Sequence, residues 1–148
     1  MDGMMKVAIM TDIGKMDYVE RPIPVPKDDE VLVKLEYVGI CGSDMHYYES
    51  GAIGDFVVKP PFVLGHECCG IVEEVGAAVK DVKVGDKVAI ETHIYCGECY
   101  QCRTGDAHNC QHLKIYGISC DGCFAEYATA PANCCFVLPE AVSYEQGA

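Results

Sequence analysis

The densest cluster of reactive side chains is a run of four cysteines in the second half of the chain. Its spacing is Cys96-x2-Cys99-x2-Cys102-x7-Cys110. Four thiolates complete the tetrahedral coordination of zinc and leave no position open, which is the chemistry of a structural metal. The polar neighbours Glu98 and Gln101 argue against four unrelated core cysteines, and Gly97 lets the backbone curl around one ion. An iron–sulfur cluster takes the same donors, so the spacing favours zinc without excluding iron.

A second set of donors is mixed and consists of Cys41, His66 and Glu67. A thiolate, an imidazole and a carboxylate leave one zinc position free for a substrate, which is the chemistry of a reactive metal. The apolar segment 60–64 leads His66 inward, so we expect His66 and Glu67 to be buried where a cation satisfies both. Asp44 is expected to accept the other imidazole N–H. The alternative is a surface pair or a hydrogen-bonded core histidine.

Composition excludes several classes of function. The 148 residues are 50% hydrophobic, enough for one domain, and their formal net charge of −12 repels nucleic acid and anionic lipid. The N-terminus, Met1–Lys6, lacks a secretory apolar run, and no run approaches about 18 apolar residues. We therefore expect a soluble, cytoplasmic protein with no membrane or nucleic-acid partner. In that compartment an odd total of 11 cysteines indicates ligands and core residues rather than disulfides.

The elements that position these donors are mostly strands. Runs of strand character cover residues 31–38, 70–75, 87–90, 125–128 and 135–138. In the first run, period-2 alternation places Val33, Leu35 and Tyr37 on the buried face. Tight turns are expected at 85–86 and 121–122.

Helices are expected to be few and short. The prolines at 22, 24 and 26 predict an extended connector. Helices are expected only after Gly42, where Ser43 would be the cap, and after Pro139, where Ser143 would be the cap. Many short strands separated by glycine and proline predict a mainly β fold, a single irregular barrel or sandwich.

Three segments carry a resemblance to a known family. They are VGICGSDMHYY at 38–48, GAIGDFVVKPP at 51–61 and VLGHE at 63–67. They resemble the zinc-dependent medium-chain alcohol dehydrogenases, most of all the sorbitol (L-iditol) and xylitol dehydrogenases, and later motifs extend the match over nearly the whole chain. The resemblance implies a GroES-like catalytic domain over residues 1–148, with a zinc-binding cysteine lobe at 93–113. It also implies two zinc ions per chain: catalytic zinc on Cys41, His66 and Glu67, and structural zinc on the four cysteines.

The resemblance also assigns catalytic roles. Ser43 and His46 would carry the substrate proton away, and their spacing of three residues lets one helical turn align them. The alternative is a cap and an exposed histidine. Tyr47 would contact a substrate hydroxyl, although Tyr48 can fill that role or either ring can simply pack. Glu67 is counted among the catalytic residues as well as the ligands.

The chain lacks one feature that the family requires. None of its 15 glycines is spaced as Gly-x-Gly, so it has no fingerprint for a dinucleotide pyrophosphate. The family continues into a Rossmann domain that binds NAD, and the full-length enzyme is expected to be a homo-oligomer. We therefore expect the isolated chain to be inactive.

Three functions remain open at this point. The segments at 47–48 and 54–59 favour a polyol dehydrogenase that converts a secondary alcohol to a ketone. The alternatives are a threonine dehydrogenase-like catalytic domain and a noncatalytic zinc-binding module. Which polyol, and whether NAD or NADP, stays open. The pair Cys120 and Cys123 is given no functional role, and one member of each of the pairs 68/69 and 134/135 is interpreted as a core residue.

Overall fold

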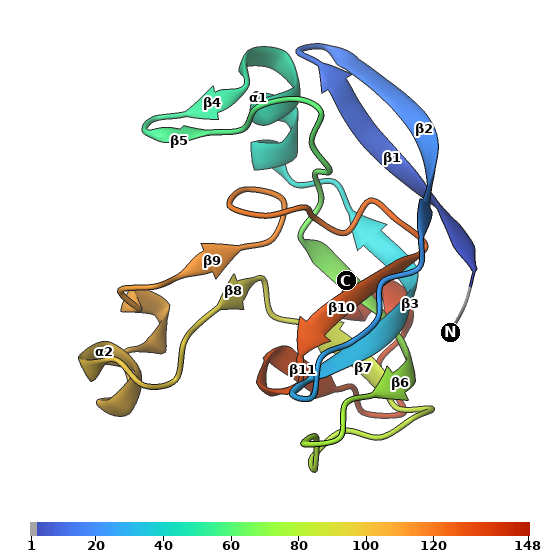
Figure 1. Cartoon of the computed structure of the whole chain (residues 1–148), viewed down its shortest axis with the longest axis vertical. Helices are drawn as coiled ribbons and strands as arrows, with labels where there is room; N and C mark the ends of the chain where they lie inside the picture. Colours follow the sequence, from blue (N-terminus) through green and yellow to red (C-terminus); the bar gives the residue numbers. More distant parts are fainter. Residues whose placement is uncertain (1–2) are drawn as a thin grey trace.

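A curled antiparallel sheet forms the centre of the computed structural model, which describes residues 3–148 (Figure 1). Met1 and Asp2, the first residues of the N-terminal segment considered above, lie outside the described residues. Within that range the largest sheet has the order β10-β3-β6-β7-β11. Its strands are β3 (Glu30–Gly39), β6 (Glu67–Val75), β7 (Lys87–Ile90), β10 (Tyr127–Pro131) and β11 (Cys135–Val137). The mainly β prediction is confirmed.

Strand β3, which lies between β10 and β6, departs from the predicted alternation at its end. Val33 is fully buried and Leu35 is partly buried, as predicted, but Tyr37 is 46% exposed. The pairing of β3 with β6 shifts register between Leu35 and Tyr37, so the extra residue Glu36 turns the following side chain to the other face. The Tyr37 hydroxyl instead donates to the Glu145 carboxylate at 3.2 Å.

The prediction for residues 121–128 is partly wrong. The strand there is β10, which begins at Tyr127 and extends to Pro131 on the edge of the sheet, where a missing N–H is tolerated. Residues 121–122 make no tight turn; the Gly122 N–H instead donates to the Val63 carbonyl. The turn at 85–86 is confirmed, because the Asp86 N–H donates to the Lys83 carbonyl at 3.1 Å.

A two-stranded ribbon, β1 (Met4–Asp12) and β2 (Lys15–Pro22), runs alongside the sheet (Figure 1). Its inner residues Met5, Val7 and Ile9 pack with Val63 in one buried cluster. Residues after Pro22 form the extended connector that the prolines predict. The ribbon therefore covers the segment that leads to His66.

Two helices follow the prediction and one does not. Helix α1 (Gly42–Ser50) forms where one was expected but begins at Gly42 itself, so its cap is Cys41 and not Ser43. Helix α3 (Tyr144–Gly147) has the predicted Ser143 cap, whose hydroxyl accepts the Gln146 N–H at 3.2 Å. The structure adds elements that the sequence analysis missed: α2 (Tyr100–Arg103), the 3-10 turns η1 (Ala107–Asn109) and η2 (Ala132–Cys134), and the short strands β4 (Ala52–Ile53), β5 (Phe56–Val57), β8 (His93–Ile94) and β9 (Lys114–Ile115). These are too short for periodicity to reveal.

The cysteines outside the two donor sets lie in or beside the core. Cys68, Cys69, Cys123, Cys134 and Cys135 are buried, and Cys120 packs against the sheet cluster. Both members of the pairs 68/69 and 134/135 are therefore interior. None of the helices within residues 3–148 has the length and apolar content that crossing a bilayer requires.

Candidate metal centres

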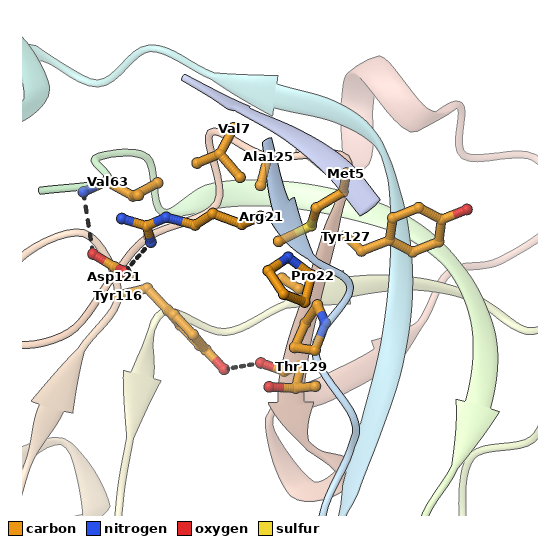
Figure 2. A pocket seen from close by; sticks show the side chains of 13 residues that line it. Met5, Val7, Arg21, Pro22, Val63, Tyr116, Asp121, Ala125, Tyr127 and Thr129 are labelled. Atoms are coloured by element: carbon orange, nitrogen blue, oxygen red, sulfur yellow. Dashed lines mark hydrogen bonds and ion pairs between the residues drawn. The ribbon is translucent and has the colours of Figure 1, made fainter. Parts of the chain in front are cut away.

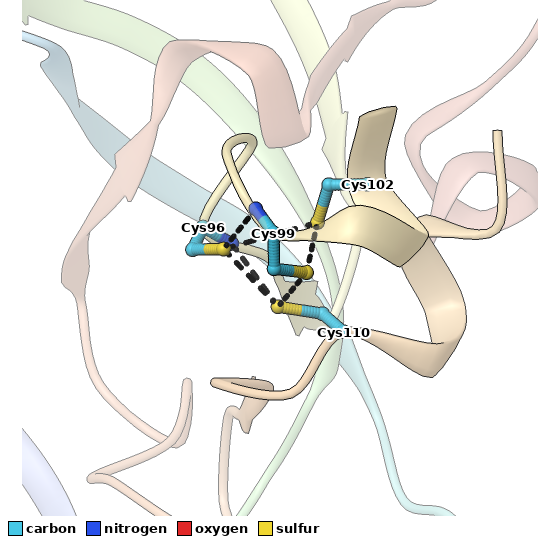
Figure 3. Close-up of side chains that lie close together, drawn as sticks. All are labelled: Cys96, Cys99, Cys102 and Cys110. Atoms are coloured by element: carbon cyan, nitrogen blue, oxygen red, sulfur yellow. Dashed lines mark hydrogen bonds between the residues drawn. The ribbon is translucent and has the colours of Figure 1, made fainter. Parts of the chain in front are cut away.

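The four cysteines meet in a small lobe that projects from the sheet on the paired strands β8 and β9 (Figures 1 and 3). Their sulfurs lie 3.4 Å apart for Cys99 and Cys102, 3.5 Å for Cys96 and Cys110, and 3.9 Å for the two other measured pairs. A tetrahedron of Zn–S bonds of about 2.3 Å has sulfur–sulfur edges of about 3.8 Å. The four side chains therefore fit one zinc ion without rearrangement.

Backbone amides point at these sulfurs and stabilise the thiolate form. The N–H groups of Cys99 and His112 donate to Cys96 and Cys110 at 3.4 and 3.3 Å. Hydrogen bonds from the backbone of Cys102 and Gln111 lower the pKa of Cys99 to about 6. Loss of hydration and the contact with Cys99 raise the pKa of Cys102 to about 12. Without a cation the lobe cannot hold four thiolates, since each charge opposes the next.

The mixed donors come from two chain segments that the sheet brings together. Cys41 lies between the end of β3 and the start of α1, while His66 and Glu67 lie at the start of β6. The pairing of β3 with β6 sets Gly39 opposite Glu67. One ligand atom from each of the three residues lies within 4.8 Å of the others. A small cation fits between them.

The buried side chain of Asp44 lies beside this donor set and binds the backbone at or next to two of its residues. It is 2% exposed, and its carboxylate accepts the N–H of Cys41 at 2.9 Å and the N–H of Gly65 at 3.0 Å. Its Oδ1 lies 3.5 Å from His66 Nδ1. Nδ1 is buried and has no hydrogen-bond partner within residues 3–148, and the Asp44 carboxylate at 3.5 Å is an acceptor close to it. A proton on Nδ1 would leave Nε2 free to ligate a metal.

The predicted burial of Glu67 is wrong, because Glu67 is exposed while His66 is largely buried. The strand explains the difference: Glu67 is the first residue of β6, where the sheet opens to solvent. Ser43 Oγ lies 3.4 Å from His66 Nε2. His46 is exposed on the same helix.

Tyr47, the residue predicted to contact a substrate hydroxyl, is buried within this domain. Tyr47 is 1% exposed and packs with Met10, Val58 and Leu64 in a core cluster. Burial raises the pKa of its hydroxyl. The Tyr48 hydroxyl donates to the Gly14 carbonyl at 2.7 Å and thus ties the helix to the ribbon. The packing of Tyr47 agrees with the alternative role, and its substrate contact stays a prediction.

The sequence analysis missed the role of Gly39. A Cβ at that position would lie 2.9 Å from Glu67 Oε2, so the absence of a side chain makes room for the carboxylate. A glycine at a strand end facing a donor is the signal that could have found it.

Comparisons with known proteins agree with this geometry. The family model for the alcohol dehydrogenase GroES-like domain matches residues 27–140. Sorbitol dehydrogenase of Bacillus subtilis (strain 168) is 41% identical over 97% of this chain and 41% of its own length. L-threonine 3-dehydrogenase of Pyrococcus abyssi is 46% identical over 87% of this chain and 37% of its own length.

A solved structure shows the same fold. A protein described as a short chain alcohol dehydrogenase (rspB) from Escherichia coli CFT073, complexed with cofactor NADH, superposes with a TM-score of 0.87 at 38% identity. The match covers 97% of this chain and 41% of that one. The chain thus spans about two fifths of the length of these proteins. It belongs to the GroES-like domain family of the zinc-dependent medium-chain alcohol dehydrogenases.

Proposed function

We propose that this chain is the catalytic domain of a zinc- and NAD-dependent polyol dehydrogenase, which oxidises a secondary alcohol to a ketone by hydride transfer. The observation that carries the proposal is the mixed donor set, whose ligand atoms lie within 4.8 Å of one another beside a buried carboxylate. The identity to a sorbitol dehydrogenase over nearly the whole chain supports the substrate class.

Cys41, His66 and Glu67 would hold the catalytic zinc, and the four lobe cysteines the structural zinc. When bound by the mixed set, zinc supplies a Lewis acid that lowers the pKa of a hydroxyl group. Asp44 Oδ1 would accept the proton of His66 Nδ1, which lies 3.5 Å away, and the Asp44 carboxylate accepts the backbone N–H groups of Cys41 and Gly65. The three ligands therefore need little reorganisation when substrate enters.

Ser43 is the residue of this chain best placed to receive a proton at the site. Its hydroxyl lies 3.4 Å from His66 Nε2, next to the position of the reacting group. His46 lies one helical turn further on and is exposed, so it can pass the proton to solvent. An imidazole suits that step because its ordinary pKa lies near neutrality.

The nicotinamide must be held by residues other than those described here. The sheet of residues 3–148 is antiparallel, and none of the 15 glycines has Gly-x-Gly spacing. Dinucleotide sites of the Rossmann type lie at the switch point of a parallel sheet. The isolated chain is therefore proposed to be inactive. As separate proposals, the complete enzyme is a homo-oligomer and works in the cytoplasm.

A threonine dehydrogenase is the second candidate, favoured by the 46% identity to the Pyrococcus abyssi enzyme. A chimera separates the two. The chain replaces the matched segment of the Bacillus subtilis sorbitol dehydrogenase, so that the relative supplies its remaining length. NAD reduction is then measured with sorbitol, xylitol and L-threonine, and a Cys41→Ser chimera serves as the control.

We expect polyol oxidation by the chimera and none by the isolated chain. A preference for L-threonine would contradict the polyol dehydrogenase and support the threonine dehydrogenase. A folded, zinc-loaded chimera without dehydrogenase activity on any of the three would favour the noncatalytic zinc-binding module.

A further inference from the structure

The segment that ends in His66 is held by a distant loop, residues 116–124, which we call the clamp loop. Three of its amides donate to three consecutive carbonyls of that segment: Gly122 to Val63 at 2.7 Å, Phe124 to Leu64 at 3.0 Å, and Cys123 to Gly65 at 2.8 Å. Neither partner belongs to the main sheet at these positions. The hydrogen bonds thus fix the backbone directly before a proposed ligand.

The two backbones are in contact, with no room for side chains between them. A Cβ on Gly122 would meet the Gly65 carbonyl oxygen and lie 2.5 Å from that of Leu64. A Cβ on Gly117 would lie 2.9 Å from the Gly65 oxygen. Gly65 itself has φ +91°, a conformation that favours glycine, and its free side faces the Phe124 ring. Any added atom here must push the clamp loop and the segment that carries His66 apart.

Asp121 anchors the clamp loop to a third element. Its carboxylate accepts the Val63 N–H at 3.2 Å and pairs with the Arg21 guanidinium of β2 at 2.6 Å (Figure 2). Arg21 and Asp121 are 36% and 50% exposed, so their charge pair alone contributes little. The hydrogen bond that Asp121 accepts from the Val63 N–H is therefore what fixes the clamp loop to the segment before His66.

We propose that Asp121 and Gly122 are positioning residues for His66, so that the clamp loop sets the metal affinity of the mixed donor set. This inference rests on the proposed function, since it takes Cys41, His66 and Glu67 as the ligands. Asp44 holds the Gly65 amide from the helix side, and the clamp loop holds the Gly65 carbonyl from the other. Both backbone polar groups of Gly65, the residue before His66, are therefore fixed by hydrogen bonds.

Cobalt(II) titration of the metal-free 148-residue chain tests the proposal. Absorbance distinguishes the two sites, because the intensity of the sulfur-to-metal band follows the number of thiolate ligands. We expect Gly122→Ala to weaken binding at the mixed set about 10- to 100-fold, the range for residues that orient ligands, and to leave the four-thiolate site unchanged.

Two controls separate positioning from a general loss of stability. Gly85 also has positive φ, but a Cβ there would meet nothing within 4 Å, so Gly85→Ala strains the backbone without touching the clamp loop. It should leave both affinities unchanged. Asp121→Asn keeps an acceptor for the Val63 amide and should retain the wild-type affinity, whereas Asp121→Ala should lose about tenfold. If Gly122→Ala fails to fold, the comparison of Asp121→Ala with Asp121→Asn still tests the proposal.

Two results would overturn the proposal while sparing the proposed function: an unchanged mixed-set affinity in Gly122→Ala and Asp121→Ala, or an equal loss at both sites in these variants. Failure of the wild-type chain to bind cobalt at the mixed set at all would instead contradict the ligand assignment and both proposals.

Discussion

The four-cysteine lobe and the mixed donor set are built in opposite ways. The lobe takes all its donors from residues 96–110, and its shape depends on few contacts beyond the paired strands β8 and β9. The mixed set joins Cys41 to His66 through the register of β3 and β6, with Asp44 and the clamp loop behind it. A local site needs the metal to define its structure, whereas a site assembled by the core exists before the metal arrives.

Removal of the metal should show this difference most strongly. Chelation of zinc should abolish amide protection in the lobe and in strand β9, which together span residues 93–115, because structural zinc supplies about 10–16 kcal/mol in small zinc-binding peptides. Protection in β3 and β6 should persist. Hydrogen exchange with and without chelator measures this, with elemental analysis expected to give two zinc ions per untreated chain. Equal loss in lobe and sheet would remove the distinction between the sites.

Cys41→Ser should empty one site and spare the other. We expect zinc to fall from two ions to one per chain, and chimera turnover to fall about 10³-fold, since Lewis-acid stabilisation supplies several kcal/mol. The denaturation midpoint should barely change, because Cys41 is only partly buried. Cys120→Ser is the matched control and should keep both ions. Retention of two zinc ions by Cys41→Ser would show that Cys41 is not a ligand.

Asp44 should matter for both stability and metal binding. Asp44→Ala leaves the amides of Cys41 and Gly65 without their acceptor, which costs about 1–3 kcal/mol per buried group. Zinc affinity at the mixed set should fall about 10- to 100-fold. Asp44→Asn keeps one acceptor oxygen and should show a smaller loss of stability. Urea denaturation and zinc competition measure the two effects, and identical behaviour of both variants would argue against the role of the carboxylate.

The smallest expected effect is on the reactivity of the Cys99 thiol in the zinc-free lobe. With a pKa of about 6 against an ordinary 9.0, Cys99 is about 90% thiolate at pH 7 rather than about 1%. Lower basicity reduces nucleophilicity, so we expect alkylation only about fourfold faster than for an ordinary thiol. Burial raises the pKa of Cys135 to about 12, and that thiol should stay unmodified. Mass spectrometry after brief iodoacetamide treatment gives the order, and modification of Cys135 before Cys99 would contradict it.

The lowered pKa of Cys99 also predicts how the stability of the zinc-free lobe changes with pH. Because the folded-state pKa of Cys99 lies below its unfolded value, the stabilisation from this thiolate is present above pH 9 and is lost as the pH falls through about 6. Zinc binding by the lobe should weaken over the same window, since protons compete for the sulfur.

The donors were predictable from residue type and spacing, but their surroundings were not. Cysteine spacing identified the lobe because its site is local in sequence, and Ser143 was found because a cap acts over three residues. The exposure of Tyr37 depends on a bulge, and the burial of Tyr47 on the ribbon and the segment before His66. Gly122 looked like a turn residue because a close approach between distant backbones has no local signature. Tertiary packing decided each of these positions.

The two ends of the lobe lie side by side, with His93 paired to Ile115 and Ile94 to Lys114. A segment with adjoining ends can be shortened to a hairpin turn or enlarged without moving the sheet that it leaves. The lobe, and with it the four-cysteine site, can therefore be gained or lost in evolution as a single inserted segment. The mixed donor set permits no such exchange, because its residues lie at or beside the ends of β3 and β6 in the main sheet.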